Sequence, residues 1–185
     1  MSYVPIKELA YALKSYYPNA DQTEKTILNC AAVAATADAV GSLIPGLAIP
    51  ATVVSCFGAV WTMYGLLCNQ LGISLKENVL KLLARAALSN IVANLGGALA
   101  ALVAGMLFPG TSIPAAAIIA FITVYLAGMV FLQLILKLAD SSNDPHGFTD
   151  INIDEMKKAM KDNKLSRDDL DAAKQAFRQN QGKTA

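Results

Sequence analysis

The 185 residues allow one domain with a short appendage, and 55% of them are hydrophobic while only 16% are charged. Soluble domains usually carry about 25% charged residues, and a net charge of +1 argues against nucleic acid as a partner. Of the 29 acidic and basic side chains, only six fall between residues 27 and 139: Asp38, Lys76, Glu77, Lys81, Arg85 and Lys137. A surface so poor in charge is typical of a protein that faces acyl chains, and helices are then expected because open strands leave backbone groups unsatisfied in lipid.

Residues 1–26 are predicted to form an amphipathic N-terminal segment with a short helix over 5–17. Pro5 suits the first turn of that helix, and Pro18 ends it. The segment has several charges and no apolar core, so it is not expected to be a signal peptide.

Four apolar segments follow and define a membrane domain over residues 27–140. They cover 27–44, 51–71, 86–108 and 115–136. Each is about 18–23 residues long, and about 20 are needed to cross the hydrocarbon core as a helix. We therefore expect four membrane helices in two hairpins, over 27–71 and 86–138.

A charged stretch at 74–86 separates the two hairpins. Ser74 followed by Glu77 is a capping-box pattern that predicts a helix start. Apolar residues share one side of this helix, and Lys81 and Arg85 lie on the other. The pattern predicts an amphipathic helix on the membrane surface.

The C-terminal residues 141–185 differ in composition and are predicted to form a soluble tail. Asp140 and a polar linker with His146 precede two capping patterns, at Asn152 and Ser166. These predict helices at about 153–163 and 167–180.

An internal repeat relates the two hairpins. Residues 41–51 match residues 105–115 at seven of eleven positions, with a constant offset of 64. Each copy places a Pro-Gly turn between two helices and a second proline at the start of the next helix. The hinge residues are Pro45, Gly46, Pro50, Pro109, Gly110 and Pro114.

Neither hinge is charged, and every Lys and Arg lies at the opposite ends of the hairpins. The positive-inside rule then places both termini and the middle helix in the cytoplasm. We expect a protein of the bacterial inner membrane with parallel repeats. Two alternatives remain open here, because the hairpins either cross fully or enter as wedges from one face.

Asp38 is the one ionisable residue well inside an apolar segment. A carboxylate in lipid is costly unless it is neutral, paired or facing water. It is either a pore-lining or proton-sensing group, or a carboxyl near the headgroups at the tip of a hairpin.

Small and polar residues form two stripes at helical spacing. The second apolar segment carries Ser55, Gly58, Thr62, Gly65 and Asn69, and the third carries Asn90, Asn94, Gly97, Ala101 and Gly105. Such stripes let helices approach closely in lipid, so helix packing is the favoured interpretation. The alternative is a polar-lined conduit.

No catalytic residue, cofactor or metal is expected. Asp150 begins a calcium-loop-like spacing, but Glu155 and Lys161 stand where that loop needs glycine and glutamate. The single histidine makes neither a zinc site nor a triad. Cys30, Cys56 and Cys68 are odd in number and lie in apolar stretches, which favours buried free thiols.

The chain from residue 27 to residue 140 resembles the uncharacterised membrane domain found C-terminal to some bacterial Era-like GTPases, and also as a stand-alone protein. The matching residues are Ile44-Pro45-Gly46, Trp61-Thr-Met-Tyr64-Gly65, Leu107-Phe-Pro109-Gly110, Thr123 and Gly128. The resemblance implies a membrane anchor or remodelling module that works with a GTPase. Because this sequence shows no phosphate-binding loop, that GTPase would act in trans.

The sequence therefore favours a non-enzymatic integral membrane module that self-assembles or docks a cytoplasmic partner. One alternative is an oligomeric channel lined by Asp38 and the stripes. The other is a pore-forming or membrane-remodelling protein that inserts its hairpins on demand. A homo-oligomer is expected.

Overall fold

The computed structural model describes residues 5–41, 48–106, 115–141 and 153–181. These residues form helices and no strand, which confirms the predicted all-α class. The elements are α1 (Ile6–Leu13), the short 3-10 turn η1 (Ala20–Gln22), α2 (Thr23–Gly41), α3 (Ala48–Leu71), α4 (Glu77–Met106), α5 (Ala115–Ser141), α6 (Ile153–Asp162) and α7 (Arg167–Gln181).

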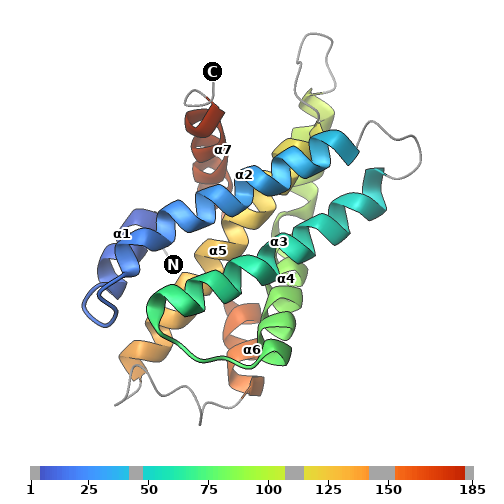
Figure 1. The fold of residues 1–185 in the computed structure, drawn as a ribbon. Helices are drawn as coiled ribbons and strands as arrows, with labels where there is room; N and C mark the ends of the chain where they lie inside the picture. Colours follow the sequence, from blue (N-terminus) through green and yellow to red (C-terminus); the bar gives the residue numbers. More distant parts are fainter. Residues whose placement is uncertain (1–4, 42–47, 107–114, 142–152, 182–185) are drawn as a thin grey trace.

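The central element is α5, which packs against every other α-helix in the described part of the chain (Figure 1). An 18-residue stretch of this helix has a mean hydropathy of 2.4, and nearly all of its side chains from residue 117 to residue 135 are buried. A helix that is apolar all round belongs either in the middle of a bundle or in a membrane. Here α5 forms the axis around which the other helices are arranged.

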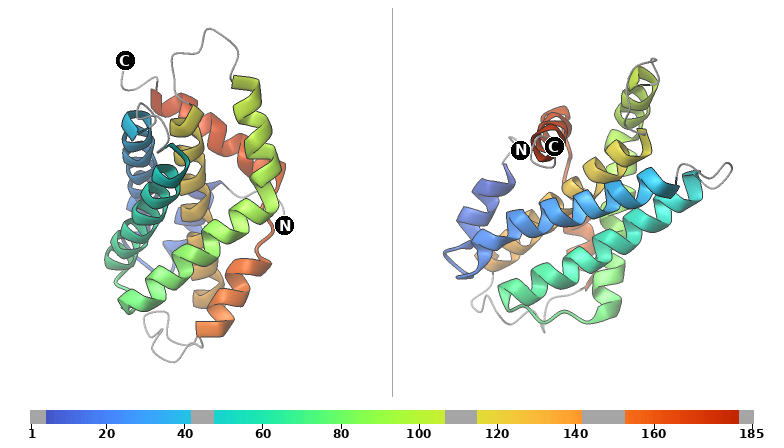
Figure 2. Two further views of the ribbon diagram at one scale, coloured as in Figure 1. Left: turned by 90° about the vertical axis from the view of Figure 1, so that its right-hand side faces the viewer. Right: turned by 45° about the horizontal axis from the view of Figure 1, so that its top comes forward.

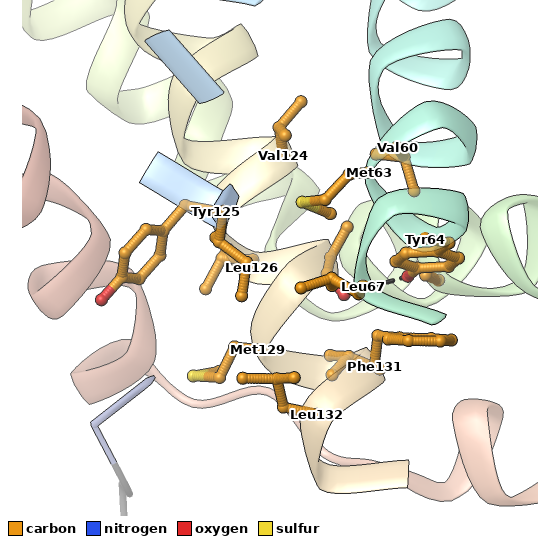
Figure 3. Close-up of a cluster of buried hydrophobic side chains, with 14 of the residues drawn as sticks. Val60, Met63, Tyr64, Leu67, Val124, Tyr125, Leu126, Met129, Phe131 and Leu132 are labelled. Carbon is orange, nitrogen blue, oxygen red and sulfur yellow. Dashed lines mark hydrogen bonds between the residues drawn. The ribbon is translucent and has the colours of Figure 1, made fainter. Parts of the chain in front are cut away.

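Figure 3 shows buried side chains of α3 packed against those of α5. The rings of Tyr64 and Phe131 stack with their centroids 4.2 Å apart. The Tyr64 hydroxyl donates a hydrogen bond of 2.9 Å to the backbone carbonyl of Ala127. Because Tyr64 is fully buried, this bond supplies the partner that its hydroxyl needs away from water.

The contact between α2 and α5 depends on one glycine. A Cβ atom at Gly128 would lie 2.8 Å from two side-chain carbons of Ile27 and 2.9 Å from a third. Ile27 is itself fully buried. The two helices therefore approach more closely at Gly128 than any side chain there would allow.

The end of α3 is fixed by Gly72, which adopts a left-handed φ of 68°. The amide of Ile73 donates to the carbonyl of Cys68 at 2.8 Å, and the amide of Gly72 donates to Asn69 at 3.3 Å. This pair of bonds is the Schellman arrangement, which stops a helix after a glycine.

The predicted surface helix at 74–86 and the third apolar segment at 86–108 are one continuous helix, α4. That helix begins at Glu77, three residues after the predicted start at Ser74. No proline or turn pattern interrupts the chain at Ala86, so the charged first turns simply continue into the apolar part. Figure 2 (left) shows α4 changing direction along its length.

Two helices, rather than the expected four, are long and apolar enough to cross a membrane among the residues that the structure describes. They are α4 over Glu77–Leu99 and α5 over Ala115–Ser141, which contain 18-residue stretches with mean hydropathies of 1.3 and 2.4.

The two C-terminal helices lie almost where the sequence places them. Ser166 begins the second helix as predicted: its amide donates to the Asp169 carboxylate at 2.7 Å, and its hydroxyl accepts from the Asp169 amide at 3.3 Å. Both helices contact the apolar bundle. In the fold, α6 packs against α4 and α5, while α7 packs against α5 and α2.

The N-terminal helix forms as predicted but is shorter, and its apolar face packs on α5. Ile6, Leu9 and Leu13 are buried there. Beyond its end, the Tyr16 hydroxyl donates a 2.6 Å hydrogen bond to the Asp140 carboxylate, and this bond raises the pKa of Tyr16. The contact ties the N-terminal segment to the charged end of α5.

Candidate membrane-facing site

Charged side chains gather at one end of each hairpin. Glu24 and Lys25 lie at the start of α2, Glu77 begins α4, and Lys137 lies in the last turns of α5. The opposite ends of α2 to α5 point toward the upper right and top of Figure 1, away from the start of α4. In α2 to α5, the charged side chains that the structure describes therefore lie toward one end of each helix.

Aromatic rings and cations meet where α4 crosses α3. The Lys81 ammonium lies 4.5 Å from the centre of the Trp61 ring, and the Arg85 guanidinium lies 5.7 Å from that of Phe57. Lys81 also forms an ion pair of 2.6 Å with Glu77, one turn earlier. Tryptophan beside basic side chains is typical of the boundary between acyl chains and water. Sequence reasoning missed this cluster, which we call the aromatic–basic belt (Phe57, Trp61, Lys81 and Arg85).

Asn90, the first residue of the stripe on α4, packs against the C-terminal tail and accepts a hydrogen bond from Asn94, the next residue of the stripe. Its side chain is buried, and its amide nitrogen donates to the carbonyls of Met160 at 2.7 Å and Asn163 at 2.8 Å. These carbonyls belong to the end of α6, where backbone acceptors have no partner within the helix. Asn163 in turn donates to the side chain of Gln133 in α5. Asn90 therefore joins α6 to α4.

The other described members of the stripes face outward. Thr62, Asn69, Asn94, Gly97 and Ala101 are exposed, and Gly58 and Gly65 are half-buried. A Cβ added at Gly58, Gly65 or Gly97 would meet nothing within 4 Å. These glycines therefore do not bring together helices of the same chain. The prediction that the stripes mediate close helix packing does not hold for them within a single chain. Contact with a second copy stays a prediction.

Several predicted positions lie outside the described side chains. This holds for Asp38 in α2, Ser55 in α3 and Gly105 in α4, whose backbones are helical. The hinge residues Pro45, Gly46, Pro109, Gly110 and Pro114 lie outside the described residues altogether. Pro50 falls in the first turn of α3, where the sequence places it.

The uncharged outer surface of α2, α3 and α4 also exposes apolar side chains. Val33 is 68% exposed, Leu66 45% and Val92 67%. Their neighbours on the same faces are Thr, Asn, Gly and Ala, and the described ion pairs all lie elsewhere. Between the belt and the hinge ends, the side chains that the structure describes on this surface carry no charge, so the surface can face lipid.

The described residues contain no group of three or more His, Cys, Asp or Glu that could hold a metal ion, and no disulfide joins the three cysteines. Comparison of the chain with protein-family models, with curated proteins and with solved structures finds no match.

Replacing Tyr64 by phenylalanine tests the polar contact inside the core. The change keeps the stack on Phe131 and removes the hydroxyl that binds the Ala127 carbonyl. We expect a loss of about 1 kcal/mol in the free energy of unfolding, measured by denaturant titration in one detergent. Tyr11→Phe is the matched control, because Tyr11 is 81% exposed. Equal stability of the two variants would show that the buried bond contributes nothing.

Proposed function

We propose that this chain is a non-enzymatic integral membrane module whose α4–α5 hairpin crosses the bilayer. The supporting observation is the distance, in α4 and α5, from the basic side chain nearest the apolar part of the helix to its far end. From Arg85 to Met106, α4 rises about 32 Å, and from Lys137 back to Ala115, α5 rises about 33 Å. Both lengths match a hydrocarbon core of about 30 Å.

The α2–α3 hairpin is shorter when it is measured from Trp61 in α3 and from Lys25 in α2. From Trp61 back to Ala48, α3 rises about 20 Å, and α2 rises about 24 Å from Lys25 to Gly41. If the belt lies at the headgroups, this hairpin enters the bilayer without reaching its other face. The proposal thus combines one crossing hairpin with one wedge, and it places the charged ends and the termini in the cytoplasm.

The cytoplasmic side supplies the surface for self-assembly or for a partner. Its exposed residues include the charged faces of α6 and α7. The resemblance noted above makes a GTPase acting in trans one such partner.

Depth-dependent quenching of tryptophan fluorescence by brominated lipids tests the membrane assignment. In vesicles of the full chain, Trp61 should be quenched best by bromines near the headgroups. In a Trp61→Phe background, Val92→Trp should be quenched best by bromines about 10 Å deeper, since Val92 follows Arg85 by two turns. Tyr11→Trp is the control, and it should resist quenching by deep bromines. A Val92→Trp signal that no brominated lipid quenches would refute the entry of α4 into the bilayer.

A second candidate, an oligomeric channel, is favoured by the outward-facing polar stripe residues on α3 and α4. Thr62, Asn69 and Asn94 are exposed in the single chain, so several copies could turn them toward a shared lumen. Light scattering in mild detergent should then give a discrete ring-sized oligomer. Ion flux into vesicles should fall in Asp38→Asn, and flux that is absent or indifferent to that change would exclude this channel.

A further inference from the structure

The most apolar of the described helices, α5, is covered along one side by the charged helix α7. α7 packs against α5 through Leu170, Ala173 and Phe177, all of which are buried. The Phe177 ring meets the Phe121 ring edge-on, with the centroids 5.2 Å apart. The opposite side of α7 exposes Arg167, Asp168, Asp171 and Arg178 to solvent.

The position of this contact along α5 matters for a membrane protein. Phe121 lies sixteen residues before Lys137, which is about 24 Å along the helix axis. α7 begins near the polar group of Asn163 and Gln133 and runs about 22 Å beside α5. Its charged side would therefore lie deep in the hydrocarbon if α5 crossed the bilayer with α7 in place.

A cleft beside the same contact is also unsuited to lipid. It has a volume of about 200 Å³ and lies between α2, α5 and α7. Tyr125 forms one wall, and Glu24, Gln175 and Gln179 contribute polar groups. A carboxylate and amides next to Tyr125 require water, which the centre of a bilayer does not supply.

The contact of α7 with α5 and the contact of lipid with the same face of α5 therefore exclude each other. We propose that the face of α5 around Phe121 and Tyr125 binds the acyl chains of the bilayer, and that α7 is a displaceable cover which occupies this face outside the membrane. The inference rests on the proposed function, because it concerns the way in which the α4–α5 hairpin enters the bilayer.

The attachment of α6 explains how α7 can leave while the tail remains bound. Asn90 holds the end of α6 through two hydrogen bonds, about 8 Å along α4 from Arg85 and therefore close to the belt. Met156 and Met160 bury the apolar side of α6 in the same region. Release of α7 breaks its packing with α5 and leaves these contacts unchanged.

Hydrogen exchange of the full chain tests this proposal, in mild aqueous detergent and in lipid nanodiscs. We expect the amides of α7 to exchange at least about tenfold faster in nanodiscs, while those of α6 keep their protection. A phospholipid with a photoactivatable diazirine in its acyl chain should label the α5 peptide that contains Phe121. Protection of α7 in nanodiscs together with labelling of that peptide would overturn the proposal.

Two variants sharpen the test. Phe177→Ala weakens the cover and should raise both the exchange of α7 in detergent and the labelling of α5 in nanodiscs. Met160→Ala is the control, because it removes a buried side chain of the tail that does not contact Phe121, and α5 labelling should stay unchanged. If α7 becomes exposed without labelling of α5 and the particle mass doubles, then a second copy of the chain covers this face of α5 in place of lipid. That result would refute the proposal. Absence of label from both α4 and α5 in every variant would instead refute the proposed function.

Discussion

Gly128→Ala lowers the free energy of unfolding by about 1–2 kcal/mol. A methyl group at this position would lie within 3 Å of three side-chain carbons of Ile27, which is fully buried and, being β-branched, has few alternative rotamers. Overpacking of this kind costs about 1–3 kcal/mol, against a gain in helix propensity of at most about 1 kcal/mol. The steric cost therefore exceeds the propensity gain.

Gly65→Ala is the matched control, because a Cβ there meets nothing within 4 Å in the structure. It should be neutral or stabilising by up to about 1 kcal/mol. Thermal and denaturant unfolding of both variants, followed by circular dichroism in the same detergent, measures the difference. An equal effect of the two substitutions would contradict the close approach of α2 and α5.

A double-mutant cycle identifies Ile27 as the obstacle. Ile27→Ala alone should cost about 2–5 kcal/mol, because it empties a buried site. In that background Gly128→Ala should cost nothing further, since the three carbons that it meets are gone. An unchanged cost in the double variant would show that another part of the chain sets the separation.

Asn90→Ala should detach the end of α6 from α4 and cost about 1–3 kcal/mol. The substitution removes both hydrogen bonds to the Met160 and Asn163 carbonyls, which stay largely shielded from water. The loss should be local, so the amides of α6 should exchange faster while those of the α3–α5 contact stay protected. Hydrogen exchange read by mass spectrometry resolves the two regions.

Two further variants separate the hydrogen bonds from the loss of volume. Asn90→Asp keeps the shape but replaces the donating amide by an acceptor, so it should be at least as harmful as Asn90→Ala. Ser89→Ala, at the exposed neighbouring position, should leave exchange in α6 unchanged. Wild-type protection of α6 in Asn90→Asp would contradict the assigned role of the amide.

The helical class follows directly from the sequence. Long apolar segments with few charges can satisfy their backbone groups only as helices, and Pro5, Gly72 and Ser166 mark helix boundaries through local chemistry that acts within a few residues. The two C-terminal helices were predictable for the same reason, because capping and amphipathic spacing are properties of neighbouring residues.

The interpretation of single residues was less predictable. Periodicity places Asn90 and Gly97 on one stripe, yet Asn90 is buried against α6 while Gly97 faces open space. Periodicity specifies which residues share a face but not what that face meets. The aromatic–basic belt was missed because Trp61 and Lys81 come from different helices, and only the crossing of α3 and α4 brings them together.

The sequence alone determined the helices, the segregation of charge toward one end of each hairpin, and the capping of α7, because each depends on composition or on residues close along the chain. The tertiary structure decided that α5 is the axis of the bundle, that Gly128 rather than the glycines of the stripes makes the close helix contact, and that α7 lies along α5. Those features depend on which apolar faces meet. Many pairings of apolar helices bury similar areas, so the choice among them depends on side-chain shape at contacts such as Ile27 against Gly128, which hydropathy does not encode.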